Sequence, residues 1–347
     1  MTSGESVAVL GAGTWGITLA TLLAGQGHRV AAWDVSREVV AQLQRDRAHE
    51  RLPHQTLPES LKVTADLGEA MQGAQTAVLV VPSHAVRELC RTLRAGGWLT
   101  PESKLVMASK GIEEDSCALM SEVIAEELSG VLDAAQRLCI LSGPSHAEEV
   151  SKRIPTAVVA AAEDEEVARE IQALFMTDRF RVYTQTDVVG VELAASLKNV
   201  IAIAAGACAG LGFGDNALAA LIARGLAEIM RLGKRRGARA ETFAGLAGIG
   251  DLVVTAMSEH SRNRRFGKLM AAGRTPEEAQ REVGMVVEGV RTARAAKAMA
   301  EREKIEVPIT EAVVAVIDGK LPFDEAVDSL MLRDPKPEIY LRHEDLS

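Results

Sequence analysis

Residues 6–34, SVAVLGAGTWGITLATLLAGQGHRVAAWD, limit the fold of this chain more than any other segment. Apolar and β-branched residues predict a strand at Val7–Leu10, helical periodicity follows over Thr14–Ala24, and a second strand is predicted at Arg29–Trp33. A G-x-G-x-x-G sequence joins the first strand to the helix, and Asp34 ends the second strand. This order and span predict a βαβ unit that binds a dinucleotide.

Each glycine of this fingerprint has its own physical role. Gly11 permits the tight turn after the strand, Gly13 leaves room for a pyrophosphate against bare backbone, and Gly16 allows the helix to pack closely on the strand. Free N–H groups at the start of the helix would face the anion, and the helix dipole would add to the attraction. The segment therefore predicts a nucleotide site.

The uncharged run Ser6–Gly27 is also compatible with a signal peptide or a membrane-spanning helix. However, no Lys or Arg precedes the run, Glu5 stands where a signal peptide is positive, and three glycines weaken a spanning helix. The next longest uncharged stretch, Asn199–Gly214, is too short and too rich in glycine to cross a bilayer. We therefore expect a soluble chain without a membrane span.

The composition excludes several classes of function. The 347 residues are 47% hydrophobic and 25% charged, which is ordinary globular material, enough for two domains. A net charge of −9 argues against nucleic acid as the main partner. The four cysteines lack C-x-x-C spacing and the seven histidines form no metal-binding pattern. We therefore expect buried thiols, a reducing cytoplasm and no metal site.

The pattern of apolar residues changes near residue 187. Before it, short apolar runs alternate with helical segments, which predicts a doubly wound, mostly parallel Rossmann-type sheet. After it, only helical patterns remain, so the chain is expected to be α/β with an all-α C-terminal domain. We expect a dinucleotide-binding domain at 1–190, a helical substrate and catalytic domain at 191–332, and a polar C-terminal tail at 333–347.

Further elements are predicted on both sides of this change. Strands are expected at Leu61–Val63, Thr76–Val81, Lys104–Ala108, Leu138–Leu141, Thr156–Ala161 and Phe180–Tyr183. Helices of the second domain are expected at Val188–Gly210, Ala217–Arg236, Thr275–Glu282, Gly289–Glu303, Thr310–Asp318 and Asp324–Leu332. The polar, proline-marked stretch His49–Glu59 is predicted as a loop.

Two lysines stand where catalytic groups are found. Lys198 lies in ELAASLKNVIAIAAG with apolar residues on every helical face, and burial would lower its pKa toward values useful for proton transfer. The alternative is a lysine whose charged end reaches the rim of a core helix. Asn199 beside it could bind a polar ligand or cap a local kink. Lys110 follows a predicted strand, where open α/β sheets bind ligands, or it is an ordinary surface lysine.

The string SGPSH (142–146) follows another predicted strand and opens a helix. Gly143 and Pro144 force a turn, and Ser145 can act as the N-cap. Capping alone would explain this serine, but a ligand oxygen could use the same exposed N–H groups.

A glycine-rich stretch and a basic run lie close together later in the sequence. Asp251 ends GLAGIGD, where the glycines suggest a close approach of backbone. The run SRNRRFG (261–267) brings together Arg262, Arg264 and Arg265 in an otherwise acidic chain. Their guanidinium groups suit a phosphate dianion, and the alternative is a solvated basic turn that pairs with Asp or Glu.

Taken together, several strings resemble the bacterial NAD(P)-dependent glycerol-3-phosphate dehydrogenases. They are GAGTWG (11–16), VPS (81–83), SKG (109–111), SGPSHAEE (142–149), LKNVIAIAAG (197–206), GLAGIGDLVVT (245–255), SRNRRFG (261–267) and VVEGVRT (286–292). The resemblance implies reversible hydride transfer between a nicotinamide cofactor and C2 of glycerol 3-phosphate, which gives dihydroxyacetone phosphate. It also implies a role in supplying glycerol 3-phosphate for phospholipid synthesis, and a homodimer.

The resemblance assigns roles to individual residues of this sequence. It implies that Lys198 is the general acid/base, that Lys110 contacts substrate near the reacting carbon, and that Asp251 orients the lysine and the substrate oxygens. The implied substrate contacts are Lys110, Gly143, Ser145, Lys198, Asn199, Asp251, Ser261, Arg262 and Asn263, with Arg262 best suited to the phosphate. The implied cofactor contacts are Thr14, Trp15, Lys110, Ala147, Arg262, Val286 and Glu288, in addition to Gly11, Gly13, Gly16 and Asp34.

One position departs from many members of this family, which carry a basic residue or His just after the second strand. Here Asp34 follows Trp33, and a carboxylate accepts from a ribose 2′-OH and repels a 2′-phosphate. Arg37, three residues on, could partly compensate. We therefore expect NAD(H) to be favoured, while NADP(H) use stays open.

Two other functions are compatible with the pattern. One is a related two-domain dehydrogenase of a non-phosphorylated hydroxy or keto acid, against which the arginine-rich 261–267 segment argues. The other is a non-catalytic nucleotide-sensing module, against which the retained Lys110, Lys198 and Asp251 argue.

Overall fold

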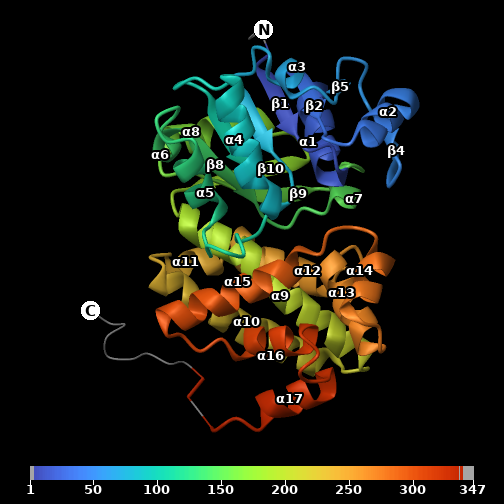
Figure 1. The fold of residues 1–347 in the computed structure, drawn as a ribbon, viewed down its shortest axis with the longest axis vertical. Coiled ribbons are helices and arrows are strands. Elements are labelled where there is room, and N and C mark those ends of the chain that lie inside the picture. Colours follow the sequence, from blue (N-terminus) through green and yellow to red (C-terminus); the bar gives the residue numbers. More distant parts are fainter. Residues whose placement is uncertain (1–3, 336, 339–347) are drawn as a thin grey trace.

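The computed structural model describes residues 4–335, 337 and 338. Within these residues eight strands form one sheet in the order β10-β9-β8-β7-β6-β1-β2-β5. Neighbouring strands are parallel except β8 and β9, which pair antiparallel (Figure 1). The bounds are β1 Ser6–Leu10, β2 Arg29–Trp33, β5 Lys62–Thr64, β6 Thr76–Leu79, β7 Lys104–Met107, β8 Leu138–Ser142, β9 Thr156–Ala161 and β10 Phe180–Gln185. The predicted mostly parallel sheet is confirmed.

Helices cover both faces of the sheet because alternate strand residues point to opposite sides. Val7 and Val9 of β1 pack with α1, α2 and α8 on one face, whereas Ala8 and Leu10 pack with α3, α4 and α5 on the other. The bounds of these and two shorter helices are α1 Thr14–Gly25, α2 Arg37–Asp46, α3 Leu67–Met71, α4 Val86–Gly96, α5 Met120–Glu127, α6 Ala134–Arg137, α7 Ala147–Val150 and α8 Glu165–Phe175. A 3₁₀ turn, Ser83–Ala85, precedes α4.

The stretch predicted as a loop at 49–59 contains a short antiparallel hairpin, which corrects that expectation. Its strands are β3 (Ala48–His49) and β4 (Leu52–Thr56). Leu52 is fully buried, although most residues around it in the sequence are polar and Pro53 argues against a central strand. At the tip, Arg51 Nη2 donates to the Gly284 carbonyl at 2.9 Å, so the hairpin reaches the helical domain.

The helical domain is built around α9 (Val188–Gly210), which begins shortly after the last strand and agrees with its predicted bounds. Its flanks contribute to two hydrophobic cores, one with α10 and α15 and one with α13, α14 and α16. In Figure 1 this domain lies below the sheet, with α9 through its middle. The remaining bounds are α10 Asp215–Arg235, α11 Ala240–Phe243, a π-helical turn Leu246–Gly250, α12 Asp251–Met257, α13 Arg262–Ala271, α14 Pro276–Val283, α15 Glu288–Glu303, α16 Pro308–Ile317 and α17 Phe323–Met331.

Two helical stretches among the described residues are long and apolar enough to cross a membrane by length and composition: Val188–Gly210 and Ala240–Met257. In the first, 89% of the most apolar 18-residue window is buried inside the protein, as in the core helix of a globular protein. In the second, 44% of the corresponding window is buried, and the segment carries Asp251 in an ion-paired cluster described below. These segments are weak evidence for a membrane span.

The predicted domain division at residue 190 falls in the first turn of α9 and stays a prediction. The predicted tail at 333–347 lies largely outside the described residues, which include only 333–335, 337 and 338 of it.

Candidate active site

The turn between β1 and α1 is shaped by its three glycines. Gly11 has a φ of +114°, and a Cβ there would lie 2.8 Å from the backbone of Val80. A Cβ on Gly16 would lie 1.8 Å from the Gly11 carbonyl oxygen, whereas a Cβ on Gly13 would meet nothing within 4 Å. α1 begins without a capping side chain, so the N–H groups of its first turn can bind an anion. The turn therefore fits a dinucleotide pyrophosphate.

Asp34 lies against this turn. Its Oδ2 accepts a hydrogen bond from the Ala12 N–H at 2.9 Å, and its Oδ1 accepts one from the Ser36 N–H at 2.9 Å. Each carboxylate oxygen has a further lone pair available for a ribose hydroxyl. Asp34 thus braces the glycine turn in addition to any contact with a ligand, which the sequence alone did not indicate.

Two lysines meet at one carboxylate. Asp251, at the start of α12, accepts from Lys110 Nζ at 2.6 Å through Oδ2 and from Lys198 Nζ through Oδ1. Lys198 lies in the middle of α9 and also donates to Thr255 Oγ1 at 2.6 Å. Lys110 lies three residues after β7 and also donates to the Gly143 carbonyl at 3.2 Å. The structure therefore joins α9, α12 and two strand-end loops at one point.

Asp251 and Lys198 are buried, with 1% and 5% of their surfaces exposed. Burial lowers the pKa of Lys198 to about 7, and the attraction of Asp251 opposes this shift while Lys110 adds to it. Burial alone would raise the pKa of Asp251, but the two lysines hold it below its ordinary value. The interpretation of Lys198 as a rim lysine is therefore wrong, because its ammonium is inside and paired.

The 142–146 segment completes the surroundings of Lys110. Gly143 has a φ of +143°, and its carbonyl accepts from both Lys110 and Ser145 Oγ, the latter at 2.9 Å. Ser145 was predicted as the N-cap of the next helix, and this prediction is wrong. The N-cap residue of α7 is His146, whose side chain makes no capping hydrogen bond. The hydroxyl turns back to its own loop instead.

His146 is a polar residue that sequence reasoning did not single out. Its Nε2 is buried and has no hydrogen-bond partner among the described residues. Its ring centroid lies 5.9 Å from that of His260. Burial and the nearby Lys198 lower the pKa of His146 to about 4, so it is neutral at physiological pH.

An amide network connects α9 to the start of α13. Asn263 Nδ2 donates to Asn199 Oδ1 at 2.8 Å, and Asn263 Oδ1 accepts from the Gly289 N–H at 2.9 Å. Both asparagines are buried. Asn199 therefore does not cap a kink, and it is fixed next to Lys198 on the same helix.

The basic run 261–267 forms the N-terminal part of helix α13. It is not the solvated basic turn that the sequence left open as an alternative. Ser261 is the N-cap and accepts from the Arg264 N–H at 3.2 Å. Arg264 forms an ion pair with Glu259, which agrees with the alternative in which the arginines pair with Asp or Glu. Arg262 Nη1 instead donates to the Val286 carbonyl at 3.0 Å. Arg262 is exposed, and its remaining N–H groups are suited to an anion.

The residues expected at the cofactor are partly brought together. Glu288, at the start of α15, accepts from the Ser83 N–H at 3.1 Å and from Ser83 Oγ at 2.6 Å, which ties α15 to the end of β6. Val286, just before it, is 36% exposed. Thr14 and Trp15 begin α1 and Ala147 begins the neighbouring α7, so these three lie on the sheet side of the site.

Comparison with known proteins decides the family. A profile described as NAD-dependent glycerol-3-phosphate dehydrogenase N-terminus matches residues 6–168, and the corresponding C-terminus profile matches residues 187–328. The chain belongs to the NAD-dependent glycerol-3-phosphate dehydrogenase family.

Individual members of this glycerol-3-phosphate dehydrogenase family are similar over nearly the whole chain. A glycerol-3-phosphate dehydrogenase [NAD(P)+] of Anaeromyxobacter dehalogenans is 49% identical over 336 residues, which are 95% of this chain and 99% of that protein. One from Lactobacillus delbrueckii subsp. bulgaricus is 45% identical over 96% of this chain and 98% of its own length. The crystal structure of glycerol-3-phosphate dehydrogenase from Coxiella burnetii superposes with a TM-score of 0.90 at 37% identity, covering 95% and 99% of the two chains. The resemblance stated from the sequence is confirmed.

Thr255 and Ser83 join the site without having been predicted. Thr255 is four residues after Asp251, which places both on one face of α12, so helical spacing within GDLVVT could have identified it. Ser83 belongs to the VPS string, but its bond to Glu288 joins positions 205 residues apart and has no local signal. Among the described residues no cluster of three His, Cys, Asp or Glu side chains is arranged to hold a metal ion.

Proposed function

We propose that this protein catalyses reversible hydride transfer between a nicotinamide dinucleotide and C2 of glycerol 3-phosphate, interconverting this substrate with dihydroxyacetone phosphate. Family membership supports the proposal. The observation that carries it is the buried Asp251 carboxylate shared by Lys198 and Lys110, because a carbonyl reduction needs a proton donor held in a water-poor site.

Lys198 is the proton donor and acceptor in this proposal. In reduction its Nζ donates a proton to the oxygen on C2, and in oxidation the neutral amine removes the proton from the C2 hydroxyl. Asp251 and Thr255 hold Nζ in place from α12. Lys110, on the opposite oxygen of Asp251, supplies positive charge where negative charge develops on the substrate oxygen. A pKa near 7 makes both protonation states of Lys198 accessible.

The cofactor fits the fingerprint turn. When bound, the nicotinamide ring supplies or accepts the hydride. Gly11, Gly13 and Gly16 form the turn that admits a pyrophosphate, and the N–H groups of Thr14 and Trp15 face outward from the start of α1. We assign further cofactor contacts to Asp34, Lys110, Ala147, Arg262, Val286 and Glu288.

The substrate phosphate is assigned to Arg262. Arg262 is an exposed residue at the start of α13. Its guanidinium is partly withdrawn from water, because burial lowers its pKa, and it donates one N–H to the Val286 carbonyl, so several donors remain. A planar fork suits a phosphate dianion better than a point charge does. Further substrate contacts in this proposal are Gly143, Ser145, Asn199, Ser261 and Asn263.

The test is oxidation of NADH, followed by its absorbance, with dihydroxyacetone phosphate as substrate. Dihydroxyacetone and a non-phosphorylated keto acid are the matched substrates that lack the phosphate. Turnover with dihydroxyacetone phosphate and little with the other two supports the proposal. Turnover with the keto acid, or none with any substrate, contradicts it.

We further propose that NAD(H) is preferred over NADP(H), because Asp34 places a carboxylate where a 2′-phosphate would bring like charge. Repulsion of about 1–3 kcal/mol corresponds to about 5- to 150-fold in affinity. Asp34→Asn keeps the size and one acceptor oxygen of the side chain while it removes the charge, and Asp34→Gly removes the support of the Ala12 N–H as well. In both variants, the ratio of kcat/KM for NADH to kcat/KM for NADPH is expected to be lower than in the unmodified enzyme.

Arg37, the first residue of α2, is the control for this preference because its guanidinium could pair with a 2′-phosphate. Arg37→Ala is expected to weaken NADPH use and leave NADH use unchanged. Equal or better use of NADPH by the unmodified enzyme would contradict the preference and leave the dehydrogenase function in place.

Three broader features complete the proposal. The chain divides into a dinucleotide-binding domain, residues 1–190, and a helical domain, residues 191–332. A homodimer is proposed because the resemblance to the family implies one. A cytoplasmic location is supported by four cysteines that are all free thiols, three of them buried.

A further inference from the structure

The segment between β7 and α5, residues 108–119, is here called the Lys110 loop. It leaves the sheet, presents Lys110 to Asp251, and then inserts Ile112, Cys117 and Leu119 into the apolar core of the helical domain. The loop closes on itself, because the Glu113 N–H donates to the Ala118 carbonyl at 2.9 Å. One loop therefore carries a residue of the proposed active site and joins both domains of the protein.

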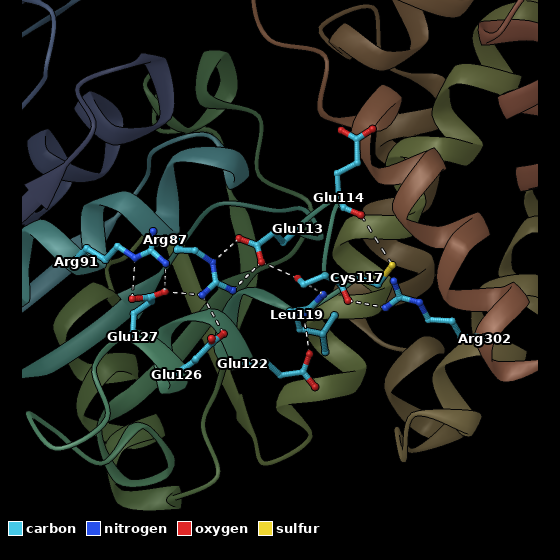
Figure 2. A network of polar contacts seen from close by, with 12 residues as sticks. Arg87, Arg91, Glu113, Glu114, Cys117, Leu119, Glu122, Glu126, Glu127 and Arg302 are labelled. Carbon is cyan, nitrogen blue, oxygen red and sulfur yellow. Dashed lines mark hydrogen bonds and ion pairs between the residues drawn. The ribbon is translucent and has the colours of Figure 1, made fainter.

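A half-buried ion pair fixes this loop to α4 on the sheet side. Arg87, in the first turn of α4, donates from Nε to Glu113 Oε1 at 2.8 Å and from Nη2 to Glu113 Oε2 at 2.7 Å (Figure 2). Both side chains are only 19% exposed. Ser116 Oγ donates to Glu113 Oε2 at 2.6 Å from within the loop, and Arg87 lowers the pKa of Glu113, so this carboxylate is charged at neutral pH. The bidentate geometry defines the orientation of both groups.

The other contacts of Arg87 hold it in place without touching the loop. Its Nη1 donates to Glu126 at 2.9 Å and to Glu127, both on α5, and Glu127 also accepts from Arg91 Nη2 at 2.9 Å. On the far side of the loop, Arg302 of α15 donates to the Ser116 carbonyl at 2.8 Å. Figure 2 shows the Lys110 loop between Arg87 on one side and Arg302 on the other.

The backbone between Lys110 and Glu113 is short and closely packed. Only Gly111 and Ile112 lie between Lys110 and Glu113. A Cβ on Gly111 would lie 2.5 Å from Ser83 Cβ, so the backbone is packed there, and Ile112 is 1% exposed. A displacement at Glu113 is therefore passed to Lys110 and is not absorbed between them.

We propose that Arg87 and Glu113 are positioning residues for the reaction: their ion pair holds the Lys110 loop so that Lys110 Nζ meets Asp251 and the Gly143 carbonyl. This inference rests on the proposed function, because it assigns Lys110 a part in dihydroxyacetone phosphate reduction. Neither residue touches the proposed substrate, and both act through Lys110.

Three variants test the proposal in the full-length protein. Glu113→Ala removes the ion pair, Glu113→Gln keeps a side chain able to hydrogen-bond to Arg87, and Arg91→Met removes an arginine of the same cluster that contacts Glu127 and not the loop. Since small misplacements of a catalytic group cost up to about 100-fold, Glu113→Ala is expected to lower kcat/KM for dihydroxyacetone phosphate by about 10- to 100-fold. Glu113→Gln is expected to recover part of this loss, and Arg91→Met to stay within about twofold of the unmodified enzyme.

Two further measurements separate positioning from general damage. The dissociation constant for NADH is expected to stay within about twofold in all three variants, since the fingerprint turn is not touched. In a Lys110→Met background, adding Glu113→Ala is expected to cost no more than about twofold, because the group that it positions is already gone. General destabilisation would lower the activity of both backgrounds by the same factor and would overturn the proposal.

The outcomes also distinguish the two proposals. If the unmodified protein reduces dihydroxyacetone phosphate and Glu113→Ala equals Arg91→Met, the positioning role is wrong and the proposed function stands. If the unmodified protein does not reduce dihydroxyacetone phosphate, both are wrong.

Discussion

A lysine inside an apolar helix is costly unless another group balances its charge, and for Lys198 that group lies on another helix. Asp251 is 53 residues further along the chain and is shared with Lys110. Sequence patterns identified all three residues as candidates: Lys198 lies among apolar residues, Lys110 follows a predicted strand, and Asp251 ends a glycine-rich stretch. They could not show that the three meet, since pairing across such separations depends on how α9 and α12 pack.

Replacing Lys198 removes the proposed acid/base and leaves the nucleotide turn intact. Lys198→Ala is expected to lower kcat by about 10²- to 10⁴-fold, while the dissociation constant for NADH changes little. Fluorescence titration with NADH checks binding, and steady-state rates check turnover. A kcat close to that of the unmodified enzyme would move the role to Lys110.

The pH dependence should have opposite signs in the two directions of the reaction. Burial lowers the pKa of Lys198 to about 7, so its ammonium is lost as pH rises through that value. Reduction needs the protonated lysine and its rate should fall across this range, whereas oxidation needs the neutral amine and its rate should rise. Initial rates in both directions, measured from about pH 6 to about pH 9, check the expectation. Parallel profiles in both directions would exclude Lys198 as the titrating group.

Arg262 tests the assignment of the phosphate. Arg262→Lys replaces a fork with a single point contact and is expected to raise KM for dihydroxyacetone phosphate by about tenfold or more, since a hydrogen bond to a charged group contributes about 1.5–3 kcal/mol. Arg265→Lys, at an exposed position on the same helix, is the matched control and should change KM little. An unchanged KM in a folded Arg262→Ala protein would rule out the phosphate role.

At the scale of elements, the packing of α9 against α13 is set by two glycines. A Cβ on Gly206 would lie 1.9 Å from the Arg264 carbonyl oxygen, and a Cβ on Gly267 would lie 1.9 Å from the Ile203 carbonyl oxygen. The two backbones therefore approach closely, and this approach brings Asn263 within reach of Asn199. Helix packing and the amide network depend on the same pair of small residues.

Gly267→Ala forces these helices apart. It is expected to reduce the free energy of unfolding by about 1–3 kcal/mol, as overpacking of a core does. Urea denaturation followed by circular dichroism measures it. Gly25→Ala, at a helical glycine where a Cβ meets nothing within 4 Å, is the control and should be neutral or slightly stabilising. Equal effects at the two sites would show that helix propensity, and not contact, decides the outcome.

Most elements could be predicted because hydrophobic periodicity is a local property. β2, β9 and α9 have the bounds that the pattern gave, since each is mostly apolar along its length. α13 was predicted only as a possible turn, because Phe266 is the main apolar residue among charged ones and its burial comes from contact with α9. The antiparallel pairing of β8 with β9 also has no local signal, because the alternation of side chains along a strand is the same whether its neighbour runs parallel or antiparallel.

At the scale of the whole molecule, polar ties at specific points add to the apolar contacts between the sheet and the helical domain. Glu288 accepts from Ser83, Arg51 donates to Gly284, and Arg87 holds the Lys110 loop. None of these ties could be predicted from the sequence, because each joins residues far apart in the chain. The site residues could be nominated one by one, but the surface on which they meet follows only from the assembled fold.

Because α9 lies at the centre of the helical domain, we expect that this domain cannot fold from its N-terminal part alone. Its apolar flanks pack on α10, α12, α13, α15 and α16, which all follow it in the sequence. A chain ending at residue 214 is therefore expected to bind a hydrophobic dye strongly and to aggregate, whereas a chain ending at residue 186, before α9 begins, should do so much less. Dye fluorescence and sedimentation check this, and similar behaviour of the two fragments would contradict it.

The same order has a consequence during synthesis. α9 is complete once residue 210 has been added, but α16, which packs on it in the second core, ends only at residue 317. At about 5–20 residues per second, a ribosome needs on the order of 5–20 s for this interval. Throughout it, α9, whose most apolar 18-residue window has a mean hydropathy of 1.7, lacks most of its packing partners. The nascent chain is thus most dependent on chaperones after its sheet has been made and before its last helices emerge.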